Sequence, residues 1–492
     1  MKKEHQQLFL YIFSILVAII TYGFALTNFS LTVDSEMPAW DPNPLNLGRW
    51  GHYFLRFYVF NGLLPYYTLL FGLIFLGITS VEMTKILNIK GIYTYIFCLM
   101  FLSFPQHAYQ LVFTLQADAV PLGYFLGTMS ISLFLKQSKI RWLKVLFNVF
   151  SVLFLASTFA MNQALILVPF VLYILYFFVQ INNSQTDVKT EFKKALSYAG
   201  YFAIAILVYL LSVKIFVKSD NSAYFLNSYA SGSTSNQFID FFKILADNIT
   251  GNLYYGEKPY ILVLLGSLIS LILFVKDKKN AWLKSLIFVV LLITPFTMSF
   301  FIRSGWHPPR IYVSSPLVFG FIIVFVLQKT PKQYYNQVLF ASMLLFLWNS
   351  YYVTNLFYTQ NKIFKHDLEI AKDISRKINS LEGFNSESDF VYFYGGLPMS
   401  NHEKLILPKS EIFESSIFRW DNGNNWRIFN FFSFNDIMYY RFLDDENSFN
   451  KIKDSLHTMP VYPLNGSVKK IENVVVVKLN NEKGAILSEW EK

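Results

Sequence analysis

LFLYIFSILVAIITYGFALTNF, residues 8–29, is a continuous stretch near the start of the chain that contains no charged residue. A helix needs about 20 apolar residues to cross the hydrocarbon core of a bilayer, so this stretch is long enough to span one. The preceding residues, MKKEHQQ, are basic, as at the start of a signal peptide, but no small-residue cleavage site follows the stretch. We therefore expect a signal anchor that stays in the mature protein.

The composition of the whole chain is that of a membrane protein. Hydrophobic residues make up 54% and charged residues only 15%, whereas roughly 25% charged is usual in soluble chains. Aromatic residues reach 19%, which suits lipid-facing helices and interfacial belts. The single cysteine, Cys98, lies inside an apolar run, which excludes an internal disulfide and a cysteine-based metal site.

Apolar runs of similar character recur along the first 357 residues. They predict a polytopic α-helical membrane protein with about eleven transmembrane helices, although the run at 91–105 is short for a span. The runs lie at residues 8–29, 59–81, 91–105, 119–135, 142–160, 164–181, 196–216, 260–275, 282–302, 311–328 and 337–357.

Basic residues cluster in alternate connections between these runs. If the N-terminus is cytoplasmic, the inside connections carry the lysines and arginines, and the short outside loops at 106–118 and 158–163 carry none. Because this is the positive-inside pattern, we attribute the net charge of +10 to membrane orientation and expect no nucleic-acid partner.

The same orientation places the polar loops on the outer side of the plasma membrane, and the segment 358–492 joins them there. This segment is rich in Lys, Glu, Asn and Ser, and DFVYFYGGLP (389–398) and VVVV (474–477) are typical of strands. We therefore predict a multi-span domain, residues 1–357, and a small extracytoplasmic α/β domain, residues 358–492. The outside loops are 31–56, 105–118, 161–163, 218–258 and 303–310.

Several chemistries lack support in the sequence. It contains no GxxxxGK[ST], no GxGxxG after a strand and no HExxH, and its histidines are scattered. We therefore expect no metal site and no cofactor. Charged residues within the apolar runs are scarce, which argues against an ion-coupled transporter.

The first outside loop, LTVDSEMPAWDPNPLNLGRWGHYFLR (31–56), concentrates acids, arginines and tryptophans between two predicted spans. Carboxylates next to low-dielectric protein are candidates for a raised pKa and for general-base catalysis. Arginines suit a phosphate, and aromatic rings with polar handles suit a sugar. Together these residues indicate glycosyl transfer at a membrane surface with a lipid phosphate as leaving group. The alternative is a solvated connecting loop.

Two short motifs resemble the Gtr-type bacterial glucosyl transferases, which decorate O-antigen and other surface polysaccharides. Asp34-Ser35-Glu36 followed by Gly48-Arg49-Trp50 resembles the first outside loop of that family. FAMNQA (159–164) is similar to the family's polar turn ending in Gln-Ala, with Asn162 where Tyr is usual. The resemblance covers roughly residues 10–350, with looser similarity around SSIFRWDNGNNWRI (415–428). It implies a GT-C-type membrane fold and a polyprenyl-phosphate glucose donor.

The candidate catalytic residues are Asp34 and Glu36. Because alternate residues of an extended loop point opposite ways, we expect only one of them to be the base. Arg49, Arg303 and Arg310 are candidate ligands of the donor phosphate, or alternatively mark the membrane boundary.

Sugar or acceptor binding is assigned to a second set of polar and aromatic residues. For the acid in this set, capping of a helix N-terminus is the structural alternative. The set comprises Gln116, Asp118, Gln163 and Trp50.

The sequence thus predicts a membrane glycosyltransferase that moves a hexose from a polyprenyl-phosphate carrier to a surface glycan on the outer face. The hexose implied by the resemblance is glucose, and the acceptor is O-antigen, teichoic acid or another polysaccharide. A polysaccharide polymerase or ligase is the first alternative. A lipid-linked sugar flippase is the second, and it should show a charged path through its spans.

Overall fold

The computed structural model describes residues 3–36, 43–62, 64–136, 138–182, 187–217, 234–276, 280–302, 307–398 and 407–484. The chain forms two compact units. The first comprises Met1–Thr27 and Ala39–Asn355, and the second comprises Asn28–Pro38 and Leu356–Lys492.

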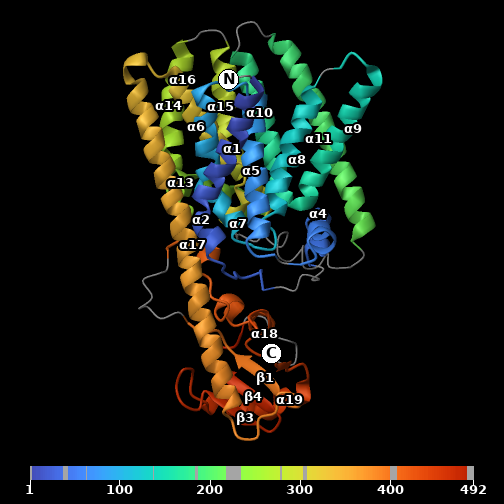
Figure 1. The fold of residues 1–492 in the computed structure, drawn as a ribbon, viewed down its shortest axis with the longest axis vertical. Helices are drawn as coiled ribbons and strands as arrows, with labels where there is room; N and C mark the ends of the chain where they lie inside the picture. Colours follow the sequence, from blue (N-terminus) through green and yellow to red (C-terminus); the bar gives the residue numbers. More distant parts are fainter. Residues whose placement is uncertain are drawn as a thin grey trace. The chain divides into compact units, whose positions relative to one another are not determined.

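The first unit is a helical bundle (Figure 1). Within the described residues, six helices are long and apolar enough to cross a bilayer, and four other apolar helices are shorter. Each predicted apolar run is helical over most of its length, which confirms the helical class, while the number of spans stays a prediction. The main helices are α1 Lys3–Thr21, α2 Gly23–Thr27, α5 Tyr67–Ile86, α6 Ile92–Ser103, α8 Ala119–Leu135, α9 Arg141–Met161, α10 Leu167–Asn182, α11 Val188–Phe216, α13 Thr234–Thr250, α14 Tyr260–Lys276, α15 Ala281–Ile293 and α16 Ser315–Lys329.

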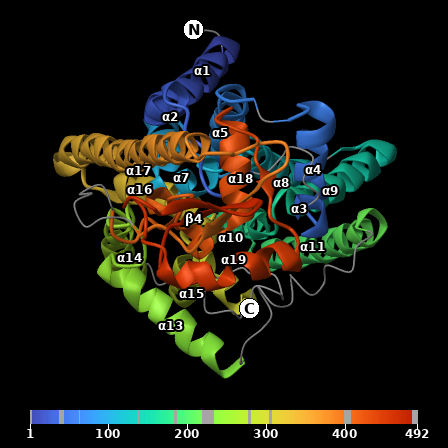
Figure 2. The same ribbon diagram turned by 90° about the horizontal axis from the view of Figure 1, so that it is seen from below.

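Packing in this bundle follows apolar faces. Helix α1 packs on α5 and α6, α8 packs on both α5 and α9, and α11 packs on α9. Figure 2 shows α13 on the opposite side of the bundle from α1. At Gly72 of α5 a Cβ atom would lie 2.0 Å from the carbonyl oxygen of Ala117, so only glycine allows this close approach.

Short helical segments form the polar loops of the first unit. Most are single turns, which lets the chain reverse direction while satisfying part of its backbone polar groups. They are α3 Asn43–Asn46, α4 Trp50–Phe54, the π-helix η1 Leu55–Val59, η2 Pro105–His107, α7 Ala108–Leu111, η3 Gln163–Ile166, η5 Thr294–Phe301, η6 Pro309–Ile311 and η7 Lys332–Tyr334.

The second unit contains a four-stranded sheet of order β2-β1-β4-β3. Strand β1 (Phe390–Tyr394) is parallel to β2 (Arg441–Phe442) and to β4 (Val474–Lys478), whereas β3 (Val468–Ile471) is antiparallel to β4. The predicted strands at 389–398 and 474–477 are therefore confirmed as β1 and β4. Both are almost entirely buried, as expected for central parallel strands covered on two faces.

Helical elements surround this sheet. The core on one side joins Tyr392 of β1, Val476 of β4 and Phe449 of α19. The part of α17 from Leu356 onward also belongs to this unit. The helical elements are α17 Tyr335–Asn379, η8 Glu411–Glu414, η9 Trp420–Asn422, α18 Asn425–Phe434 and α19 Glu446–Thr458.

The beginning of the first predicted loop also belongs to the second unit. The Nδ2 atom of Asn361 donates to the carbonyl oxygen of Phe29 at 3.2 Å and to Oγ of Ser30 at 2.8 Å. The ring of Phe29 packs against Phe364, and it stacks on Phe434. Residues 28–36 are thus held by the C-terminal segment.

Candidate active site

Asp34 and Glu36 bind the same guanidinium group. In Arg427, Nη2 lies 2.8 Å from Oδ1 of Asp34, Nη1 lies 2.5 Å from Oε1 of Glu36, and Nε lies 2.8 Å from Oδ2 of Asp421. The expectation that Asp34 and Glu36 point opposite ways is wrong. Asp34 has a φ of 69°, so this segment is a turn and lacks the alternation of an extended strand.

The two acids differ in their access to solvent. The side chain of Asp34 is 44% exposed, whereas that of Glu36 is 0% exposed. Burial raises the pKa of Glu36 to about 7, which the charge of Arg427 opposes and that of Asp34 reinforces. The Oε2 atom of Glu36 is buried and has no hydrogen-bond partner among the described residues. Of the two, Asp34 is the acid that an incoming hydroxyl can reach.

Arg427 is held in the first turn of α18 by its neighbours. The Oδ1 atom of Asn424 accepts a hydrogen bond from the backbone nitrogen of Trp426 at 3.0 Å and so caps the helix. The side chain of Asn425 bonds both the backbone nitrogen and the carbonyl oxygen of Phe393 in β1, each at 2.7 Å. The central strand of the sheet therefore fixes the start of α18. Arg427 lies in the stretch 415–428, but no local pattern in the sequence marks it as a site residue.

A pocket in the first unit draws on four of the predicted outside loops. Its volume is about 300 Å³, at the lower end of the range for small-molecule sites. Polar side chains come from all four loops, and much of the remaining wall is apolar. The polar lining residues are Arg49, Gln110, Gln116, Asn162, Gln163 and Arg310, and the apolar ones include Phe159, Ile206, Leu210, Met298 and Ile302.

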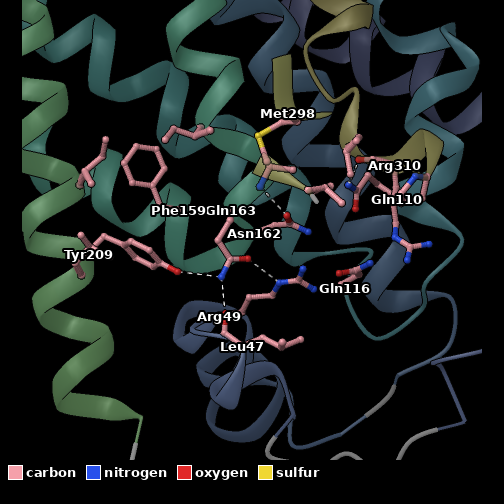
Figure 3. A pocket seen from close by; sticks show the side chains of 17 residues that line it. Leu47, Arg49, Gln110, Gln116, Phe159, Asn162, Gln163, Tyr209, Met298 and Arg310 are labelled. Atoms are coloured by element: carbon pink, nitrogen blue, oxygen red, sulfur yellow. Dashed lines mark hydrogen bonds between the residues drawn. The ribbon is translucent and has the colours of Figure 1, made fainter. Parts of the chain in front are cut away.

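Gln163 fixes the position of Arg49 in this pocket (Figure 3). The Nε atom of Arg49 donates to Oε1 of Gln163 at 3.0 Å. The Nε2 atom of Gln163 donates to the hydroxyl of Tyr209 at 3.0 Å and to the carbonyl oxygen of Leu47 at 2.5 Å. Neighbouring Asn162 caps η3, because its Oδ1 accepts from the backbone nitrogen of Ala164 at 3.0 Å. Asn162 therefore has a structural role at the start of η3.

Two glutamines of the second predicted outside loop hold the backbone around Arg310. The Nε2 atom of Gln106 donates to the carbonyl oxygen of Pro309 at 3.2 Å, and that of Gln110 donates to the carbonyl oxygen of Arg310 at 2.5 Å. The Arg310 guanidinium lies 5.2 Å from the ring centre of Phe113. Figure 3 shows Arg49, Gln116 and Arg310 on one side of the pocket. This arrangement suits an anion attached to a hydrocarbon chain.

Comparison with known families identifies the family of this chain. A family model described as glucosyl transferase GtrII matches residues 23–327, which is more than half of the 492 residues. The chain belongs to the GtrII glucosyl transferase family. No curated protein and no solved structure matches the chain.

Membership in the GtrII family confirms the predicted resemblance and makes the protein a glycosyltransferase with a sugar donor and a glycan acceptor. The matched range contains Asp34, Glu36 and every residue that lines the pocket. Arg427 lies beyond the match, so its role has to be inferred from its contacts.

The remaining predicted site residues are placed as follows. Asp118 is fully buried, caps α8 and binds Nη2 of Arg56 at 2.8 Å, and it does not line the pocket. Trp50 donates from Nε1 to Oγ of Ser212 at 2.8 Å, which attaches it to α11. These contacts give Asp118 and Trp50 structural roles, and sugar binding by them stays a prediction. Arg303 lies outside the described residues.

Proposed function

We propose that this GtrII family member transfers glucose from a polyprenyl-phosphate carrier to a cell-surface polysaccharide on the outer face of the plasma membrane. The observation that carries the proposal is the lining of the pocket. Arg49 and Arg310 lie beside amide side chains in a cavity whose remaining wall is largely apolar. A polyprenyl phosphate combines an anionic head with a hydrocarbon tail. The arginines of the pocket match the head, and the apolar wall matches the tail.

In this proposal three groups of residues each bind a different part of the donor. Arg49 and Arg310 bind the phosphate, with Arg303 as a further candidate. Gln116 and Gln163 bind the sugar hydroxyls through hydrogen bonds. The apolar wall, which includes Ile206 and Leu210 of α11, receives the first part of the isoprenoid chain.

The proposed chemistry is an inverting displacement with Asp34 as general base. Asp34 removes the proton from an acceptor hydroxyl, and the acceptor oxygen attacks the anomeric carbon from the face opposite the phosphate. The bond between that carbon and the phosphate oxygen breaks, and polyprenyl phosphate leaves with its charge stabilised by arginine. The products are the glucosylated polysaccharide, polyprenyl phosphate and a proton that Asp34 returns to water.

The orientation of the chain in the membrane is part of the proposal. The alternation of basic loops supports a cytoplasmic N-terminus with the acids, the pocket loops and residues 358–492 outside. Reporter fusions at Lys139 and Lys332 should therefore report the cytoplasm, and a fusion at Phe384 should report the outside. A cytoplasmic signal at Phe384 would overturn the orientation.

A donor-choice assay tests the reaction itself. Purified protein in lipid nanodiscs is given labelled glucose on polyprenyl phosphate or on a nucleoside diphosphate, together with a surface polysaccharide. We expect transfer only from the lipid donor, with one polyprenyl phosphate released per glucose transferred. Transfer from the nucleotide sugar, or transfer without release of lipid phosphate, would contradict the proposal.

A further inference from the structure

Three carboxylates converge on Arg427 in the second unit. Asp34, Glu36 and Asp421 each bind a different nitrogen of its guanidinium, so every nitrogen of the guanidinium contacts an acid. The Arg427 side chain is only 11% exposed. Acids gathered around one buried guanidinium are costly to desolvate, and such a group persists only where its geometry is firmly held.

A tight turn carries Asp421, the acid that contacts Nε of Arg427. Asp421, Asn422 and Gly423 have successive φ values of 50°, 51° and 84°, a run of left-handed residues that makes a very tight turn. At Gly423 a Cβ atom would lie 2.0 Å from the carbonyl oxygen of Gly395, the residue that follows β1, so a side chain has no room there. The cluster therefore lies at the carboxyl end of a central parallel strand, where open α/β sheets usually place ligand-binding groups.

The contacts indicate different roles for Asp34 and Glu36, the two acids of the first loop. Glu36 is enclosed and anchors the segment to Arg427, whereas Asp34 shares the same guanidinium but keeps part of its carboxylate at the surface. Because both acids contact one planar guanidinium, Arg427 fixes the position of Asp34 relative to Glu36.

We propose that Arg427 is a positioning residue of the glucosyl transfer reaction, which binds Asp34, Glu36 and Asp421 together and so holds Asp34 oriented toward the acceptor hydroxyl. The inference rests on the proposed function, in which Asp34 is the base. Arg427 touches neither donor nor acceptor in this role. It acts through Asp34, and it supplies the fixed positive charge that the three acids need.

The competing explanation is that Arg427 only neutralises the buried Glu36. The double variant Arg427→Gln with Glu36→Gln separates the two explanations, because it removes the buried charge together with its partner. We expect this variant to keep the unfolding temperature of the parent but to lose about a hundredfold in kcat, the size of loss that displacement of a reacting group by about 1 Å causes. The KM for the lipid donor should stay within about threefold of the parent.

A matched control separates the proposed role from a general effect of removing an arginine from the second unit. Arg427→Gln should lower kcat while the KM for the lipid donor stays within about threefold of the parent. The matched control is Arg441→Gln in the same unit, since Arg441 binds the backbone carbonyl of Glu387 and the ring of Phe390. It should keep the kcat and the donor KM of the parent.

The kinetics of these variants either support or contradict the proposed role of Arg427. If the double variant turns over like the parent, Arg427 only compensates for Glu36 and the proposal is wrong. If the double variant does not fold, Arg427→Lys decides instead, because lysine keeps the charge but loses the fork. A loss of about tenfold in kcat at an unchanged donor KM supports the proposal, and an unchanged kcat overturns it. If Asp34→Asn remains fully active, the base assignment itself fails, which is a separate result.

Discussion

The Nη1 atom of Arg427 lies 2.5 Å from Oε1 of Glu36, although 391 residues separate the two in the chain. This contact makes the start of the first loop a part of the C-terminal α/β unit. It also encloses one of the two first-loop acids and leaves the other accessible, which gives the acids different roles in the predictions that follow.

Replacing Asp34 should abolish most of the turnover. Asp34→Asn keeps the shape of the side chain but removes the base, and proton transfer by a positioned group contributes typically 10²–10⁴-fold. We expect a loss of at least about a hundredfold in kcat, measured as released lipid phosphate, with donor binding retained. Glu36→Gln should cost less than about tenfold, because the enclosed acid anchors the segment. If both variants stay within about threefold of the parent, the first loop does not contain the base.

Glu36 should make the stability of the protein depend on pH. Its pKa of about 7 in the folded protein exceeds its ordinary value of 4.5, so the folded state binds more protons between these values. Stability should therefore fall as pH rises from about 4.5 to about 7, by on the order of 3 kcal/mol. The unfolding temperature of the parent, measured between about pH 5 and pH 8, should decline more steeply than that of Glu36→Gln. Parallel curves for the two proteins would contradict the prediction.

Arg49 should govern affinity for the donor. A hydrogen bond to a charged group contributes about 1.5–3 kcal/mol, so Arg49→Gln should raise the KM for polyprenyl-phosphate glucose by roughly ten- to a hundredfold. The matched control is Arg141→Gln, because Arg141 is exposed at the start of α9 and does not line the pocket. Equal KM values for the two variants would remove Arg49 from the donor site.

Asp118 should prove to be a structural residue. It forms a buried ion pair with Arg56, and removal of one partner from such a pair costs roughly 3–5 kcal/mol. Asp118→Asn should therefore lower the unfolding temperature while the folded protein keeps the donor KM of the parent. The paired change Arg56→Met with Asp118→Leu should recover part of the stability. A rise in KM at unchanged stability would instead support sugar binding by Asp118.

Catalysis should not require a divalent cation. Arg427 occupies the position between Asp34, Glu36 and Asp421 where a cation would otherwise balance these acids. The parent should keep its full turnover in EDTA. Loss of activity in EDTA that Mg²⁺ or Mn²⁺ restores would show that the reaction uses a metal.

The sequence predicted those features that depend on local pattern. Long apolar runs identified the helices, and buried runs of valine and aromatic residues identified β1 and β4. Arg49, Gln116, Gln163 and Arg310 were predicted because they are polar residues on loops between apolar runs, and all four line one pocket.

The features that were missed depend on contacts between distant residues. The ion pair of Asp118 with Arg56 was not predicted, because 62 residues separate the two and leave no periodic signal. The expected orientation of Asp34 was wrong because its φ of 69° lies in the left-handed region, which residues other than glycine rarely adopt. Arg427 was overlooked because its three partners come from two separate segments of the chain.

The division of the chain into units limits which segments two related genes can exchange by recombination. The second unit is assembled from residues 28–38 and 356–492, so the first unit is interrupted after residue 27 and resumes at residue 39. A fragment that begins at residue 356 would carry Arg427 without Asp34 and Glu36, and Asn361 without its partners at Phe29 and Ser30. One crossover between two related genes would therefore separate the acids from their arginine. Exchange of this unit between enzymes requires its N-terminal and C-terminal pieces to be inherited from the same parent.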